Sequence, residues 1–185
     1  MLTLSLGSPD SGAELRALEP WHAHEVFAHI DAAREHLRPW IPTASRVVDV
    51  ETAGEFLQYF ADQQARDTGR LYGIWVDGRL SGGTLFKNFD TRIGIAEIGV
   101  WLAPDAEGRG LIAMAVRHMI DWAFRDRGLY RIEWRNSPDN PRSRAVAKRL
   151  GLTHEGTLRG DFMVNGNRQD SDVWAVLAHE WPSQP

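Results

Sequence analysis

Residues 97–116 read EIGVWLAPDAEGRGLIAMAV and combine three structural signals. The run 93–102 predicts a β-strand, and residues 110–127 repeat apolar side chains at helical spacing. Between them lies a short polar turn, 107–110, with glycine at two of its positions. A strand is therefore expected to pass into a helix through a glycine-containing turn.

Such a turn is suited to binding an anion. Gly108 and Gly110 allow the backbone N–H groups at the start of the helix to point together into open space, and this positive end binds phosphate oxygens. Arg109 adds a positive charge beside them. The same glycines would also serve a plain tight turn, and neither a P-loop nor the dinucleotide-binding fingerprint is present. Both interpretations stay open at this point.

The rest of the chain mixes helical and strand patterns. Asp-Gly at 77–78 and Asn-Gly at 165–166 are typical of hairpin turns, because both central positions of a type I′ turn need positive φ. The patterns predict an α/β fold with a mixed sheet. The expected strands lie in 2–18, 71–76, 80–86, 93–102, 129–136 and 172–177, and the expected helices cover 20–36, 50–65, 110–127 and 140–151.

Length and composition are typical of one soluble domain over residues 1–185, with 43% hydrophobic and 25% charged residues. No apolar stretch approaches the ~20 residues of a membrane span, and the first residues lack the features of a signal peptide, so we expect a cytoplasmic protein. The chain has no cysteine, which excludes disulfides and a cysteine nucleophile. The histidines at 22, 24, 29 and 36 show no metal-ligand spacing, so no metal site is expected.

Charge is spread unevenly along the chain. The net charge of −4 argues against non-specific nucleic-acid binding. Residues 105–168 hold 12 Lys and Arg against 8 Asp and Glu, whereas residues 1–104 hold 9 against 14. An anionic ligand would suit the basic segment, although ordinary solvated faces would produce the same distribution.

Two segments carry a resemblance to a known family. Residues 97–116 and the segment NSPDNPRSRAVAKRLGLTHEGTLR at 136–159 resemble the GNAT superfamily of acyl-CoA N-acyltransferases, most closely its branch of ribosomal-protein N-terminal acetyltransferases, RimJ and RimL. The resemblance implies a twisted, mixed and mostly antiparallel sheet, flanked by helices and splayed between its central strands. It also implies that the pantetheine arm of acetyl-CoA lies in the gap and pairs with a bulged strand, here 97–102, which includes Val100 and Leu102.

The resemblance also indicates the residues that bind the cofactor. The diphosphate loop of the family reads Q/R-x-x-G-x-G/A, and this chain offers Glu107, Gly108, Arg109, Gly110, Leu111 and Ile112. Gly110 matches the central glycine, while Glu107 and Ile112 depart from the pattern. Asn140 and Ser143 match the N-x-x-S pattern of the branch, which implies that Asn140 helps to hold pantetheine and that Ser143 lies near the thioester sulfur.

Transfer of an acyl group from a thioester to an ammonium group needs a base, because only the neutral amine attacks, and an acid helps the thiolate to leave. By resemblance, Glu97 and Asp161 are the candidate bases and Ser143 is the candidate acid, while the backbone N–H of Val100 or a neighbour polarises the carbonyl. Each carboxylate could instead be solvated or salt-bridged, and Ser143 could merely cap a helix. Because the chain has no cysteine, we expect direct transfer in a ternary complex.

The acceptor is left open by the sequence. The loop after the first helix borders the acceptor cleft in the resembling branch, which makes His36, Arg38 and Trp40 candidate substrate residues. A protein N-terminus is the suggested acceptor of the acetyl group, and small amines or antibiotics, with succinyl-CoA as donor, are alternatives. A catalytically silent CoA-binding module is the alternative from another class. A homodimer is compatible with the sequence, although no feature indicates one.

Overall fold

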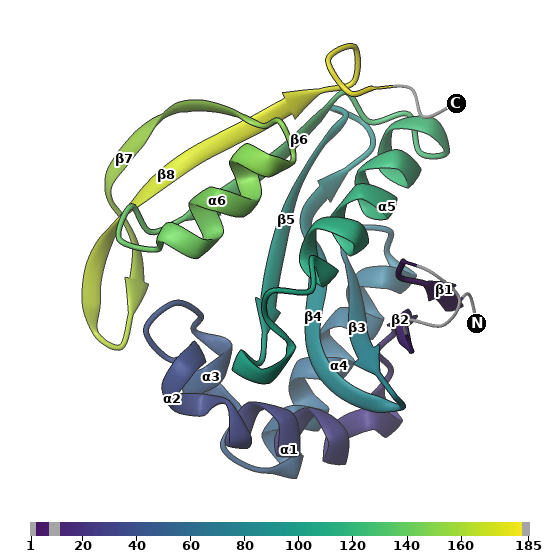
Figure 1. Cartoon of the computed structure of the whole chain (residues 1–185), viewed down its shortest axis with the longest axis vertical. Coiled ribbons are helices and arrows are strands. Elements are labelled where there is room, and N and C mark those ends of the chain that lie inside the picture. The colour runs from purple at the N-terminus through teal and green to yellow at the C-terminus, as the bar shows by residue number, and fades with distance from the viewer. Residues whose placement is uncertain (1–2, 8–11, 183–185) are drawn as a thin grey trace.

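A computed structural model describes residues 3–7 and 12–182, and their strands form one eight-stranded sheet (Figure 1). The strand order is β1-β2-β3-β4-β5-β6-β8-β7, and neighbouring strands are antiparallel except for β5 and β6. Residues 2 and 8–11 of the expected strand region 2–18 lie outside the described residues. The strands are β1 (Thr3–Ser5), β2 (Ala13–Ala17), β3 (Arg70–Val76), β4 (Arg79–Asp90), β5 (Ile95–Leu102), β6 (Arg131–Asn136), β7 (Thr153–Val164) and β8 (Asn167–Leu177).

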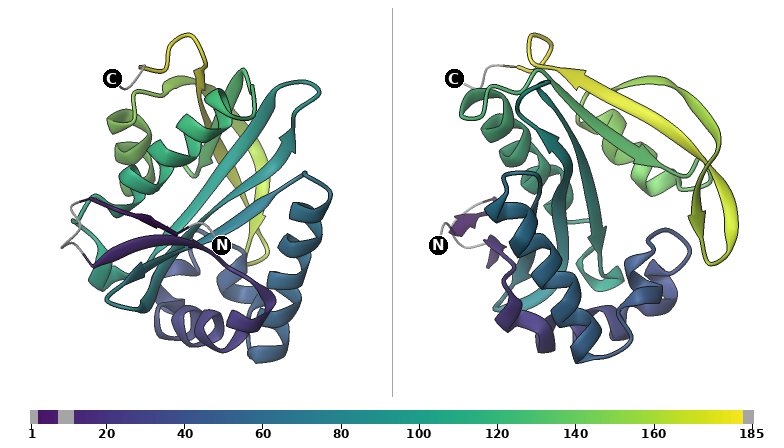
Figure 2. Two further views of the ribbon diagram at one scale, coloured as in Figure 1. Left: turned by 90° about the vertical axis from the view of Figure 1, so that its right-hand side faces the viewer. Right: turned by 180° about the vertical axis from the view of Figure 1, so that it is seen from behind.

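The long helices divide between the two faces of the sheet (Figures 1 and 2). On one face α5 (Leu111–Arg125) packs against β4 and β5, and α6 (Pro141–Arg149) packs against β6. On the other face α1 (Ala23–Ala32) contacts β4, and α4 (Val50–Ala65) contacts β3. A separate cluster of buried apolar side chains fills the space on each face. The expected α/β fold with a mixed, mostly antiparallel sheet is confirmed.

Local sequence signals account for several of these elements. The stripe of α5 predicted from helical spacing is buried, with Ala115, Val116 and Ile120 fully enclosed. Asp77 and Gly78 have φ values of +50° and +78°, and Asn165 and Gly166 have +51° and +77°, so both predicted hairpin turns use left-handed backbone at both central positions. These turns set the registers of the β3–β4 and β7–β8 hairpins.

The central strands β5 and β6 diverge, as the family resemblance implied. Their parallel pairing extends from Ile95 opposite Arg131 to Ile98 opposite Trp134. Beyond Ile98, β5 continues to Leu102 and stays paired with β4, while β6 stays paired with β8. The edge of β5 from residue 99 to 102 that faces β6 therefore has no strand partner within the described chain.

The expected bulge lies on a different strand. From Gly82 opposite Leu102 to Lys87 opposite Glu97 the β4–β5 register is regular, so the segment 97–102 is not bulged. The register shifts between Lys87 and Asp90, where β4 carries one extra residue and Asn88 has a φ of +52°. Asparagine tolerates left-handed backbone better than most residues, which explains why the extra residue is accommodated there.

Two predicted helices have different bounds in the structure. The helix expected over 20–36 is a 3-10 turn, η2 (Pro20–His22), followed by α1 and the short α2 (Arg34–Leu37), with the break at Ala33. After α2 the chain forms another short helix, α3 (Thr43–Arg46). Figure 1 shows α2 and α3 side by side beneath the splayed strands, and we call residues 34–46 the α2–α3 arm. The helix expected from Gly110 is preceded by the 3-10 turn η3 (Pro104–Ala106) and runs from Leu111 to Arg125. Among the described residues, no helix combines the length and apolar character needed to cross a membrane.

Candidate active site

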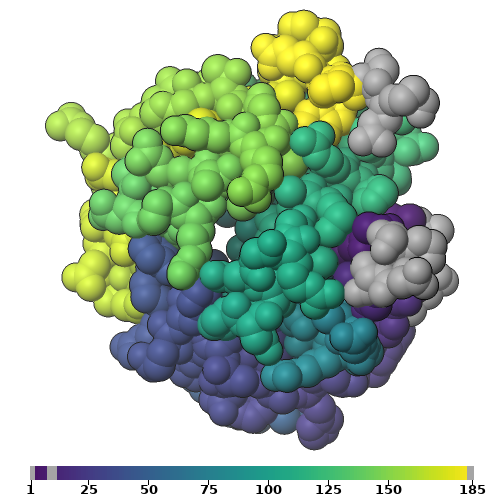
Figure 3. All heavy atoms as spheres, in the orientation of Figure 1, coloured from purple at the N-terminus to yellow at the C-terminus, as the bar shows by residue number. Residues whose placement is uncertain are grey.

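A cavity of about 670 Å³ lies where β5 and β6 diverge. Its walls come from both strands, from the loop before α5, from the first turns of α5 and α6, from the α2–α3 arm and from β7. The space-filling view shows an opening through the molecule between the α2–α3 arm and the green segment that contains α6 (Figure 3). Segments distant in sequence therefore meet around one space.

The glycine turn forms part of this wall. Gly108 and Gly110 have φ values of +76° and +74°, and Gly110 is the N-cap residue of α5. No side chain of the described residues caps this helix, so its first backbone N–H groups are available to an outside acceptor. A Cβ atom on either glycine would meet no heavy atom within 4 Å, so backbone conformation rather than crowding requires glycine here.

Glu97 stands at the point where the two strands separate, and its side chain is buried. Lys87 Nζ lies 2.7 Å from Glu97 Oε1, and Asn88 Nδ2 donates a 3.4 Å hydrogen bond to Oε2. Arg135 Nε is 3.9 Å from the same Oε2. The carboxylate of Glu97 is therefore salt-bridged in this structure, as one of the alternatives held.

Asp161, on β7, approaches the same guanidinium. Its Oδ2 lies 3.6 Å from Arg135 Nη1, and Arg135 also donates a 3.1 Å hydrogen bond to Glu133. Burial opposes the charge of Arg135, but the hydrogen bond to Glu133 and the carboxylates of Glu97 and Asp161 together raise its pKa above the ordinary value. The two candidate bases thus share one cation that stays charged.

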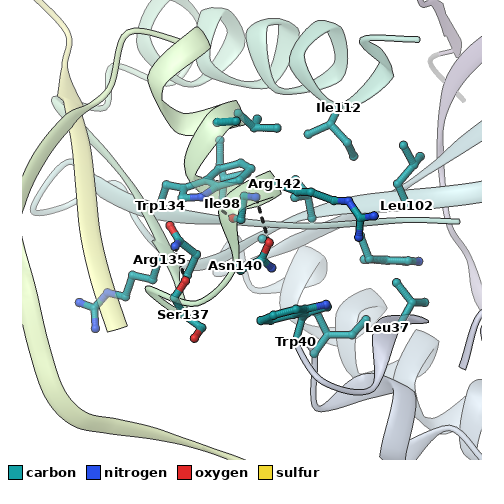
Figure 4. A pocket seen from close by; sticks show the side chains of 18 of the residues that line it. Leu37, Trp40, Ile98, Leu102, Ile112, Trp134, Arg135, Ser137, Asn140 and Arg142 are labelled. Carbon is teal, nitrogen blue, oxygen red and sulfur yellow. Dashed lines mark hydrogen bonds between the residues drawn. The ribbon is translucent and has the colours of Figure 1, made fainter. Parts of the chain in front are cut away.

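Asn140 and Ser143, at the start of α6, also line the cavity, and Figure 4 labels Asn140. Asn140 is the N-cap of α6, and its Oδ1 accepts a 3.1 Å hydrogen bond from the Ser143 N–H. The Ser143 hydroxyl oxygen accepts a 3.0 Å hydrogen bond from Trp134 Nε1, which leaves the hydroxyl proton available for donation. The alternative in which Ser143 itself caps the helix is wrong, because Asn140 fills that role.

The predicted acceptor residues are only partly brought together. His36 and Trp40 line the cavity, and Figure 4 shows Trp40 across the space from Asn140 and Trp134. Arg38 is not a lining residue; its backbone carbonyl instead accepts a 2.9 Å hydrogen bond from Asn165 Nδ2. Of the predicted cofactor residues, Val100, Leu102, Glu107, Gly108, Gly110, Leu111 and Ile112 line the cavity, whereas Arg109 does not.

Several residues that line the cavity were not predicted from the sequence. Lys87 and Arg135 surround Glu97, and the alternation Arg131-Glu133-Arg135 on one face of β6 was a signal for the second of them. Asn136, at the end of β6, has a buried Oδ1 with no hydrogen-bond partner in the described structure. A buried carbonyl oxygen left unpaired is costly, so a ligand N–H would be a favourable partner for it.

The tip of the β7–β8 hairpin is joined to the α2–α3 arm beside the cavity. Asn165, in the hairpin turn, bonds the arm twice: its Nδ2 donates to Arg38, and Ser45 Oγ donates a 2.6 Å hydrogen bond to its Oδ1. In the wall formed by the glycine turn, Glu107 lies between His36 of the arm and Arg142 of α6. Across the described residues, no group of three or more His, Asp or Glu side chains could hold a metal ion.

Comparison with known proteins identifies a family. The profile described as acetyltransferase (GNAT) domain matches residues 13–153. YdaF of Bacillus subtilis (strain 168), a provisionally named ribosomal N-acetyltransferase, is 32% identical over 175 residues, covering 92% of this chain and 93% of that protein. The ribosomal-protein-serine acetyltransferase of Escherichia coli (strain K12) is 25% identical over 164 residues, covering 89% and 92%. Mycobacterium smegmatis RimJ, solved in complex with CoA-disulfide, superposes with a TM-score of 0.86 at 26% identity, covering 93% of this chain and 85% of RimJ.

Proposed function

This chain belongs to the GNAT family of acetyltransferases, and on that premise we propose that it transfers acetyl from acetyl-CoA directly to the primary amine of a protein N-terminus. The observation that supports the proposal most strongly is that a single cavity connects the groups that would bind the donor with the groups that would act on the acceptor. The uncapped start of α5, the unpaired edge of β5 and two carboxylates all open into it.

The donor fits the residues that are present. The N–H groups at the start of α5 would bind the diphosphate, because a helix N-terminus with glycine before it attracts phosphate oxygens. The amide groups of pantetheine would pair with the edge of β5 at Val100 and Leu102, and Asn136 Oδ1 would accept from an N–H of the same arm. Asn140, whose Oδ1 caps α6, keeps its Nδ2 for donation to the donor.

The chemistry needs one proton removed and one supplied. A carboxylate takes a proton from the ammonium of the acceptor, and the neutral amine then attacks the thioester carbon. We assign this step to Glu97, at the divergence of the strands, with Asp161 as the second candidate. The backbone N–H of Val100 would stabilise the oxyanion. As the C–S bond breaks, the Ser143 hydroxyl, oriented by Trp134 Nε1, protonates the departing thiolate. Ser143 regains a proton from the amine nitrogen, which loses its second N–H proton as the amide forms.

A protein N-terminus is favoured over other amines by the relatives. Two proteins similar to this chain over most of its length carry names of ribosomal acetylation. The cavity adds a geometric argument, because Asn165 joins the hairpin to the α2–α3 arm and makes the acceptor side a passage rather than an open shelf. A thin chain end suits such a passage better than a bulky ring system.

The test exploits the absence of cysteine. Thiol release from acetyl-CoA, and separately from succinyl-CoA, is followed over a panel of N-terminal peptides, polyamines and aminoglycosides, with no thiol background from the protein. Release that depends on acetyl-CoA and on a peptide supports the proposal. Binding of CoA without turnover on any acceptor would favour the silent module, and release with polyamines or aminoglycosides alone would overturn the assigned acceptor.

A further inference from the structure

Glu107 occupies an unusual place in the cavity wall. It directly precedes Gly108, and its carboxylate reaches two other segments. Glu107 Oε1 lies 3.1 Å from His36 Nε2 on α2, and Oε2 lies 3.4 Å from Arg142 Nε in the first turn of α6. All three side chains line the cavity.

This carboxylate lies in the region where a donor diphosphate would enter. It stands four residues before Leu111, where the positive end of α5 begins, and it neutralises a guanidinium that faces the same space. An incoming diphosphate would be attracted by the N–H groups of α5 and by Arg142, and repelled by Glu107. A negative side chain at this position therefore opposes the binding of a negative ligand.

We infer that Glu107 is an internal competitor of the donor diphosphate: its carboxylate pairs with Arg142, and when the donor binds, Arg142 passes from the carboxylate to the phosphate. This inference rests on the proposed use of acetyl-CoA. It makes Glu107 a specificity-determining residue, because a donor must offer Arg142 a stronger anionic partner than a carboxylate. Guanidinium groups bind phosphate with two parallel hydrogen bonds, which supplies that stronger partner.

The size of the effect follows from the charge that is removed. Replacing Glu107 by glutamine keeps the shape of the side chain and deletes one negative charge next to Gly108, and in the proposed complex that charge would lie roughly 4–8 Å from the phosphates. In partly solvated surroundings, one unit charge at that range changes affinity by roughly three- to tenfold. We therefore expect the Glu107→Gln variant to bind CoA roughly three- to tenfold more tightly, and the gain to shrink as salt is added.

Calorimetric titrations with CoA and with pantetheine test the inference. Pantetheine lacks the diphosphate, so Glu107→Gln should leave its affinity unchanged while CoA binds more tightly. Arg142→Met should weaken CoA. That loss should be larger in the Glu107→Gln background, because there Arg142 gives up no partner when it binds phosphate. Glu55→Gln removes the same charge from an exposed position on α4 and is the matched control, with no expected change.

The outcomes separate this inference from the proposed function. If the wild-type protein and all variants fail to bind CoA, the proposed donor is wrong and the inference fails with it. If CoA binds but Glu107→Gln does not tighten it, or tightens pantetheine equally, the donor assignment stands and the competitor role is refuted. If the glutamine variant unfolds, Glu107→Ala removes the same negative charge and its affinity for CoA is measured instead. The folding of each variant is checked by a thermal melt.

Discussion

Lowering the pH should destabilise this protein through one buried histidine. His29 on α1 is 8% exposed, and its Nε2 accepts a 3.1 Å hydrogen bond from Trp101 Nε1 on β5. Burial lowers the pKa of His29 from 6.5 to about 4, and this outweighs the hydrogen bond to the Leu80 backbone and the charge of Asp105, both of which act in the opposite direction. Protonation would also remove the acceptor that Trp101 uses.

The sign and size of this pH effect follow from the linkage between proton binding and folding. Between pH 6.5 and 4 the unfolded chain binds a proton at this position that the folded protein excludes, so stability falls as the pH falls through this window. A difference of that size corresponds to about 3 kcal/mol in total, of which about 2 kcal/mol is lost between pH 7.5 and 5. Carboxylates with lowered pKa values, such as Asp67 at about 2, contribute at lower pH than His29 does.

Urea unfolding at a series of pH values measures this contribution. The wild-type protein should lose about 2 kcal/mol of unfolding free energy between pH 7.5 and 5. His29→Gln, which does not titrate, should be less stable at pH 7.5 and should lose much less over the same range. Equal losses in the two proteins would refute the assignment of the buried neutral state to His29.

Three further results are expected at the cavity. Glu97→Gln should lower kcat about 100-fold or more with an unchanged Kd for CoA, measured by steady-state kinetics and calorimetry; a larger loss in Asp161→Asn would reverse the assignment of the base. Ser143→Ala should lower kcat about tenfold, because a thiolate leaves readily even without an acid, and an unchanged kcat would contradict its role as proton donor. Gly110→Ala should cost about 1 kcal/mol of stability in a thermal melt, because its φ is +74°, and should weaken CoA binding; a more stable variant would contradict the left-handed backbone.

Elements whose signals are local were predictable. The turns at Asp77 and Asn165 depend on residues that tolerate positive φ, and the buried stripe of α5 depends on spacing within one helix. Both signals are complete within a few consecutive residues. The break of the first helix at Ala33 was missed, because alanine is not a helix-breaking residue and no local signal marks that point.

The surroundings of the candidate site could not be predicted in the same way. Lys87 meets Glu97 because the β4–β5 register pairs them, and a one-residue slip would place Lys87 on the opposite face. Arg135 reaches Asp161 because β6 and β7 lie on either side of β8. Asn165 and Ser45 are far apart in sequence and meet only through the whole fold.

The sequence by itself determined the strand, the glycine turn and the helix of residues 97–116, because backbone preference and side-chain periodicity act over short distances. It also indicated the family. The tertiary structure alone decided that Glu97 and Asp161 share Arg135, that Glu107 joins His36 to Arg142, and that the hairpin tip bonds the α2–α3 arm. Those contacts join segments whose separation is set by sheet order and by the divergence of β5 from β6, and neither quantity is encoded in any one stretch of the chain.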